Sequence, residues 1–172
     1  MAKIAIGLGL ALATLTALTV LGYFSAGNKP GFITPDLFTA DFNLWLEILL
    51  VLGLTVGAFL ARRGSIEAHR VNQTIWVLVN GALVLFLMLQ SMSEVKVTKP
   101  ADLADVRTAV TWVHAIVGTL TFGSGIWLVL QMNNILPVAW RITWWKKLMR
   151  LTLAGYWIVA ILGIVTYYYW YY

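Results

Sequence analysis

Four ionisable side chains lie inside or at the edge of long apolar stretches of the chain: Glu47, His69, Arg70 and His114. An ionisable group in a membrane span costs a few kcal/mol on insertion scales, so each of these is a candidate functional residue. Glu47 is the only carboxylate that we place within a span, and Asn43 shares its helix face one turn earlier. Glu47 could accept a proton, support a histidine, or simply reach toward the lipid headgroups.

His114 lies about six residues into a later apolar stretch, at a depth similar to that of Glu47. We therefore expect that the two side chains can touch. A neutral imidazole can serve as an axial ligand to haem or chlorophyll, hydrogen-bond a quinone, or form an ordinary interior hydrogen bond. His114 is the candidate metal ligand of the chain. Small and polar residues continue its helix stripe and are expected to face the bundle: Thr111, Gly118, Thr121 and Gly125.

His69 and Arg70 open the preceding apolar stretch at its other end. This pair is either a solvated helix start near anionic headgroups or a group that holds a haem propionate, a quinone or a partner's acidic loop. The length of chain between His69 and His114 predicts roughly 25 Å of depth between them, so we do not expect them to share one haem. Asn80 is the deepest amide, and we expect it to hydrogen-bond to a neighbouring helix.

The elements that position these residues are five apolar stretches, each near the 20 or so residues that a bilayer crossing requires. We place them at about 4–25, 43–61, 71–92, 108–131 and 149–170. Apolar residues make up 60% of the chain and charged residues only 11%, against about 25% charged in ordinary soluble domains. The prediction is an all-α integral membrane bundle of five transmembrane helices, forming a single domain over residues 1–172.

The distribution of basic residues predicts an orientation. The N-terminal side of the five spans would collect Lys3, Arg62, Arg63, Arg70, Arg141, Lys146, Lys147 and Arg150, and the other side Lys29, Lys96, Lys99 and Arg107. The positive-inside rule then favours N-in, C-out. This arrangement accounts for the net charge of +5 without nucleic acid as a partner. Tryptophans 140, 144 and 145 and the aromatic run 167–172 are typical of interface belts, or of a surface that docks another subunit.

Several functional classes are excluded or disfavoured. The chain has no cysteine, which rules out disulfides, thiolate metal sites and iron-sulfur clusters. We find no nucleotide-binding or metalloprotease motif, no nucleophile–base pair and no inverted repeat, so neither an enzyme nor a transporter is our leading interpretation. Glycine pairs such as Gly53 and Gly57 favour close helix packing within the chain, or otherwise an interface with another subunit, and Gly118, Gly123 and Gly125 could act likewise.

The order of these features resembles a family of small bacterial multi-pass membrane proteins of unknown function that includes a haem-copper oxidase maturation factor. The resemblance covers about 43–170 and rests on Asn43, Arg62-Arg63-Gly64, His69-Arg70, Trp112-Val113-His114 and the pattern from Met149 through Trp157 to Tyr167. The family pattern has a further histidine before the last helix. This chain has Trp144-Trp145-Lys146-Lys147 there.

The resemblance implies a role in assembling or supporting a terminal oxidase. Our leading interpretation is a non-catalytic accessory subunit or assembly factor of a haem-containing respiratory or photosynthetic electron-transfer complex, in the bacterial inner (cytoplasmic) membrane. Its partners would be the lipid bilayer and other membrane subunits of that complex. The alternative is a redox or pigment subunit that binds haem or chlorophyll through His114. No cofactor is required by the leading interpretation.

Overall fold

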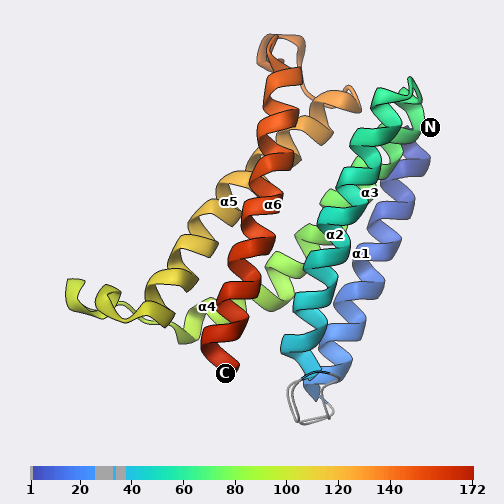
Figure 1. Cartoon of the computed structure of the whole chain (residues 1–172). Coiled ribbons are helices and arrows are strands. Elements are labelled where there is room, and N and C mark those ends of the chain that lie inside the picture. Colours follow the sequence, from blue (N-terminus) through green and yellow to red (C-terminus); the bar gives the residue numbers. More distant parts are fainter. Residues whose placement is uncertain (1, 26–32, 34–37) are drawn as a thin grey trace.

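The computed structural model describes residues 2–25, 33 and 38–172, which form an all-α bundle (Figure 1). Its long helices are α1 (Ala2–Ser25), α2 (Phe38–Arg62), α3 (Ile66–Leu83), α5 (Val106–Met132) and α6 (Trp145–Tyr171). A π-helical segment, η1 (Val84–Met88), continues α3 directly into the short α4 (Leu89–Glu94). The connections contain the short 3₁₀ helices η2 (Pro100–Ala104) and η3 (Val138–Trp140). The five-helix prediction is confirmed at this level.

Four helices are long and apolar enough to cross a membrane: Phe38–Arg62, Ile66–Met88, Val106–Met132 and Trp145–Tyr171. The apolar stretch described in α1, Lys3–Thr19, is shorter. The helices extend a few residues beyond the predicted spans at most ends. The largest differences at helix starts are five residues, since α2 starts at Phe38 rather than 43 and α3 at Ile66 rather than 71.

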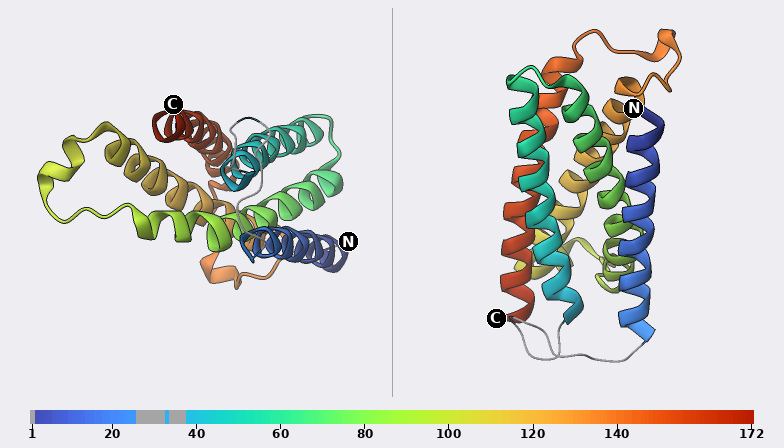
Figure 2. Two further views of the ribbon diagram at one scale, coloured as in Figure 1. Left: turned by 90° about the horizontal axis from the view of Figure 1, so that it is seen from below. Right: turned by 90° about the vertical axis from the view of Figure 1, so that its right-hand side faces the viewer.

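The chain runs up and down, so that its two termini lie at opposite ends of the bundle (Figures 1 and 2). We call these the N-terminal end, where α3 and α6 begin, and the C-terminal end, where α2 and α5 begin. α1 packs mainly on α3, α5 packs on α6, and α2 contacts both α3 and α6. α2 therefore joins the two groups of helices and contributes to both candidate sites.

Two helices end in the same hydrogen-bonded motif. After α2, Gly64 has a φ of +81°, its N–H bonds to the Ala61 carbonyl, and the Ser65 N–H bonds to the Leu60 carbonyl at 3.0 Å. After α5, Asn134 has a φ of 59° and the Ile135 N–H bonds to the Leu130 carbonyl at 2.9 Å. Glycine and asparagine are the residues that most readily adopt this left-handed conformation, which satisfies the last carbonyls of a helix.

The connection before α5 is fixed by two aspartates. Asp105 caps α5 by accepting a hydrogen bond from the Thr108 N–H at 2.9 Å, and this bond holds the pKa of its carboxyl below the usual range. Hydrogen bonds from Thr98 and Lys99 likewise lower the pKa of Asp102. Both carboxylates therefore remain ionised at neutral pH and hold the turn that leads into α5.

Glycine positions decide how closely the helices approach. A Cβ on Gly53 would overlap the indole of Trp76 on α3, and one on Gly57 would overlap the amides of Asn72 and Gln73. The Gly53/Gly57 pair thus packs within the chain, as predicted. On α5, Gly125 lies against Tyr156 of α6. Gly123 does not pack closely within the chain, because a Cβ there would meet nothing within 4 Å, and the alternative of an interface with another subunit stays a prediction.

Candidate functional site

Glu47 and His114 meet where α2, α5 and α6 come together. Glu47 is only 6% exposed, and its Oε1 lies 3.7 Å from Nε2 of His114. Gly163 of α6 provides the room, because a Cβ at this position would overlap the Glu47 carboxylate. The similar depth of the two residues made a contact possible, and in the structure the two side chains lie next to each other. At 3.7 Å it is a close approach of a carboxylate and an imidazole, longer than a hydrogen bond.

Four polar side chains gather at this junction, and we call them the α2–α5–α6 polar cluster: Asn43, Glu47, His114 and Thr166. Each has a buried atom without a hydrogen-bond partner, namely Asn43 Oδ1, Glu47 Oε1, His114 Nδ1 and Thr166 Oγ1. The Val159 carbonyl of α6 also lies near the His114 ring. The Val159 carbonyl can serve the His114 ring, which leaves three oxygens, and because buried polar groups are nearly always satisfied, these need ordered water or another bound group as a partner.

Helix register places the members of the cluster together. Asn43 lies one turn from Glu47, toward the C-terminal end. Thr166 lies almost one turn from Gly163 in the same direction, on an antiparallel helix. Because Gly163 faces the Glu47 carboxylate, Asn43 and Thr166 are at the same level of the bundle. Thr166 was not among the predicted site residues, and its buried hydroxyl is visible only in the structure.

The C-terminal end of this junction is closed by further side-chain hydrogen bonds. Asp41 is completely buried, accepts a 2.7 Å hydrogen bond from the Ile33 N–H, and accepts another from the Tyr167 hydroxyl. Trp170 Nε1 donates to Thr111 Oγ1 at 2.9 Å and connects α6 to α5. We had placed Asp41 in the connection before the second span. It lies instead in the first turn of α2, held by α6.

The His69 region is organised differently, because its polar side chains are matched to carbonyl groups of α2. The His69 Nδ1 lies 2.8 Å from the Gly57 carbonyl, Asn72 Nδ2 donates to the Gly53 carbonyl at 2.8 Å, and Gln73 Nε2 donates to the Leu54 carbonyl at 3.0 Å. A carbonyl can only accept, so Nδ1 of His69 carries the proton. Its Nε2 is buried and has no partner.

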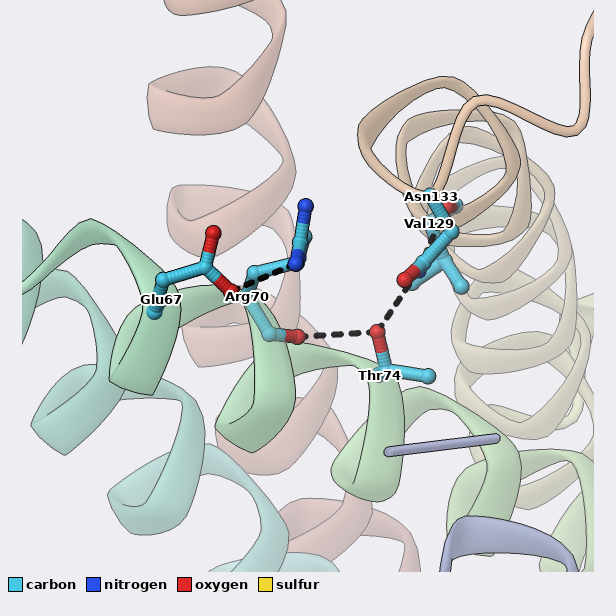
Figure 3. A network of polar contacts seen from close by, with 5 residues as sticks. All are labelled: Glu67, Arg70, Thr74, Val129 and Asn133. Atoms are coloured by element: carbon cyan, nitrogen blue, oxygen red, sulfur yellow. Dashed lines mark hydrogen bonds and ion pairs between the residues drawn. The ribbon is translucent and has the colours of Figure 1, made fainter. Parts of the chain in front are cut away.

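Arg70 belongs to a chain of contacts that joins α3 to α5 (Figure 3). Its guanidinium pairs with Glu67 of its own helix at 2.5 Å. Its carbonyl accepts a hydrogen bond from Thr74 Oγ1 at 2.8 Å, and Thr74 in turn accepts one from Asn133 Nδ2 at 2.9 Å. Asn133 also bonds to the Val129 carbonyl. Around Arg70, the polar residues of α3 thus contribute to helix packing.

The two histidines occupy separate places. His69 contacts Gly57 and His114 contacts Glu47, ten positions apart on α2, which is about 15 Å of helix. Our estimate of roughly 25 Å was too large, because it counted the whole run through η1 and α4 as vertical travel, whereas α4 turns away toward α5 (Figure 1). Even 15 Å is several times the spacing of two axial ligands on one iron. Among the described residues, no group of three or more His, Cys, Asp or Glu could hold a metal ion.

Between the two places, one buried hydrogen bond crosses the middle of the bundle. Asn80 Nδ2 of α3 donates to the Tyr156 hydroxyl of α6 at 3.2 Å, and both residues are buried. This confirms the expectation that the deepest amide bonds to a neighbouring helix. Tyr156 was not anticipated, because a tyrosine in the last apolar stretch carries no sequence signal for this role.

The fold and its polar residues define a class: a multi-pass α-helical membrane protein with two separate buried polar regions, each of which holds buried polar atoms without a hydrogen-bond partner. No protein-family model, curated protein or solved structure matches the chain. The resemblance given above therefore remains a prediction.

Proposed function

We propose that this protein is a non-catalytic accessory subunit or assembly factor of a haem-containing electron-transfer complex. It would reside in the bacterial cytoplasmic membrane with its N-terminus inside. The observation that carries the proposal is how the polar residues near His69 are used. His69, Asn72 and Gln73 each bond to a carbonyl of α2, so the side chains best suited to chemistry at that end instead hold two helices together.

Two further features support a role beside other membrane subunits. The family-like residue pattern includes Asn43, His69-Arg70 and His114, and each of these has a buried polar side-chain atom in the structure. Large aromatic side chains are also exposed at both ends of α6, including Trp144 at 51% and Tyr168 at 60%. Exposed aromatic residues are enriched both at membrane interfaces and where proteins dock.

The test is affinity purification of the full chain, tagged at its C-terminus, from native membranes in mild detergent. We expect subunits of an oxidase, a quinol-oxidising complex or a photosynthetic complex to co-purify, and haem absorbance to follow them. A tagged, unrelated multi-pass protein from the same membranes is the control. Recovery of the chain alone, together with normal assembly and activity of those complexes in a deletion strain, would refute the proposal.

A second candidate function is a haem- or chlorophyll-binding subunit. His114, the residue predicted for this role, is arranged poorly for it, because its Nε2 faces Glu47 at 3.7 Å and the carboxylate would have to withdraw. His69 fits better. Its Nδ1–H is fixed by the Gly57 carbonyl and its Nε2 has no partner, which is the arrangement that orients a histidine ligand. Haem bound there would supply one-electron chemistry.

Visible spectroscopy of the purified chain separates the two candidates. The second predicts a Soret or chlorin band that is lost in His69→Ala and retained in His114→Ala. Loss in His114→Ala alone would instead assign the ligand to the α2–α5–α6 polar cluster. A colourless protein, also after incubation with haem, would leave no support for a pigment or redox carrier.

A further inference from the structure

We propose that the α2–α5–α6 polar cluster binds a small monovalent cation, with sodium as the ion that fits its chemistry. The ligands would be the side-chain oxygens of Asn43, Glu47 and Thr166. This inference goes beyond the proposed function and does not depend on it.

The atoms that lack a hydrogen-bond partner at this site indicate what kind of group could bind there. On α2 and α6 the unpaired atoms are all oxygens: Asn43 Oδ1, Glu47 Oε1 and Thr166 Oγ1. An amide oxygen and a carboxylate oxygen only accept hydrogen bonds, so what satisfies them must be a proton donor or a cation. The head of an oxidised quinone carries only carbonyl acceptors, so it could not donate a hydrogen bond to either of these oxygens.

The buried carboxylate of Glu47 requires a neutralising positive charge or a proton. Glu47 is 6% exposed, and no Lys or Arg ion pair with it is found among the described residues. An ionised carboxylate buried without a counter-charge is strongly unfavourable, so it must be neutralised by a proton or by a bound cation. Among the residues that the structure describes, the one ion-pair partner of Glu47 is His114, whose Nε2 lies at 3.7 Å. A cation would make a positive charge on His114 unnecessary.

The side chains of the cluster favour a monovalent ion. One carboxylate, one amide and one hydroxyl provide a single negative charge and hard oxygen ligands. Calcium sites use more oxygens and usually several carboxylates, and transition metals prefer imidazole or thiolate ligands. The described residues contain no group of three or more His, Cys, Asp or Glu that would suit such ions. A singly charged ion neutralises Glu47 and leaves the site uncharged within the apolar bundle.

The α6 backbone lies against the Glu47 carboxylate. Gly163 has no side chain where a Cβ would overlap the Glu47 carboxylate, and this brings the α6 backbone close to the cluster. Asn43 and Thr166 lie about one turn nearer the C-terminal end, below the Asp41–Tyr167 hydrogen bond. This hydrogen bond closes the C-terminal end of the site, so a cation could enter there only when it opens.

The experiment is thermal unfolding of the full chain in detergent, followed by the fluorescence of its 9 tryptophans, at fixed pH and ionic strength. Sodium, lithium, potassium and choline chloride are compared. If sodium is present at ten times its dissociation constant, we expect the Tm to be higher in sodium than in choline by about 3–6 °C. Binding of ²²Na⁺ to the same preparation gives an independent measure.

Two nearly isosteric variants locate the site. Glu47→Gln should abolish the sodium-dependent shift, and Thr166→Val should weaken the apparent sodium affinity at least fivefold. The matched controls are Glu67→Gln, whose side chain is 59% exposed, and Thr119→Val, whose hydroxyl bonds to the Ala115 carbonyl of its own helix. Both controls should behave like the wild type.

Three results would overturn the proposal. The first is a wild-type Tm that is the same in all four salts, as expected if water molecules satisfy the cluster. The second is a sodium shift of full size in both Glu47→Gln and Thr166→Val, which would place the ion elsewhere. The third is an equal shift with every alkali cation that disappears in neither variant. If Glu47→Gln fails to fold, Thr166→Val still decides between these outcomes.

Discussion

Gly53→Ala offers the most direct test of how α2 and α3 are held together. The added Cβ would overlap the Trp76 indole, which is a rigid ring and cannot be displaced as easily as the end of a flexible side chain. The same position carries the carbonyl that accepts the 2.8 Å hydrogen bond from Asn72. One methyl group would therefore disturb both the closest packing and one of the polar contacts between these helices.

The magnitude follows from three contributions. Overpacking in a tight core costs about 1–3 kcal/mol, and a polar contact between membrane helices contributes about 0.6 kcal/mol on average. The higher helix propensity of alanine returns up to about 1 kcal/mol. We expect Gly53→Ala to lower the free energy of unfolding by about 1–3 kcal/mol.

The chain contains a matched control for this substitution. Gly123 is also a helical glycine, but a Cβ there would meet nothing within 4 Å. Gly123→Ala should leave stability unchanged or raise it by up to about 1 kcal/mol. Unfolding would be followed by circular dichroism in mixed micelles of increasing SDS content. Equal stability of the two alanine variants would refute the packing argument, because it would show that Trp76 moves aside without cost.

Three further outcomes follow from particular contacts. A double-mutant cycle with Asn80→Leu and Tyr156→Phe should give a coupling free energy of about 0.6 kcal/mol and at most about 1.7 kcal/mol, since both groups are buried and share a 3.2 Å hydrogen bond. A coupling free energy of zero would mean that this hydrogen bond does not form in the bilayer. The Asp105 cap should be retained at neutral pH and lost on acidification. Because the pKa of Asp105 is lowered in the folded state, its contribution to stability is fully present above the unfolded pKa of about 3.9 and is lost as the pH falls through the folded pKa. The amide resonance of Thr108, followed by NMR, should accordingly titrate with a midpoint below 3.9, and a midpoint at or above that value would contradict the cap. His69→Ala should destabilise the protein by about 1–3 kcal/mol, through the lost bond to an α2 carbonyl and the space left behind, and unchanged unfolding would indicate that the ring is held for another purpose.

Much of the fold was predictable, because apolar length and turn chemistry act locally. Gly64 lies where α2 needs a left-handed residue to end, and the Gly53/Gly57 pair marks the close approach to α3. The error at the start of α2 has a physical cause. The predicted span begins after Asp41 because a charged carboxylate is costly in lipid, but a carboxylate that accepts hydrogen bonds from Ile33 and Tyr167 can be buried.

The candidate site was predictable only in part. The sequence predicts that Glu47 and His114 lie at similar depth, because helix rise and chain direction set the depth of each residue in its span. Thr166 and Gly163 could not be assigned to the same place, because their position depends on how α6 is rotated and how it is aligned with α2. Helix rotation is set by packing over the whole bundle, and no local pattern in the last apolar stretch reports it.

The contrast between the two polar regions is the main argument for where function resides. Near His69, side chains on α3 meet carbonyls on α2, and this pairing explains why those residues are polar. In the α2–α5–α6 polar cluster, no such pairing explains Asn43, Glu47 or Thr166, whose oxygens are buried without partners. A purely structural junction at that depth would be more stable with apolar residues. The unpaired oxygens there therefore point to an occupant that is a cation or a proton donor, whereas near His69 the unpaired atoms are the nitrogens His69 Nε2 and Arg70 Nε.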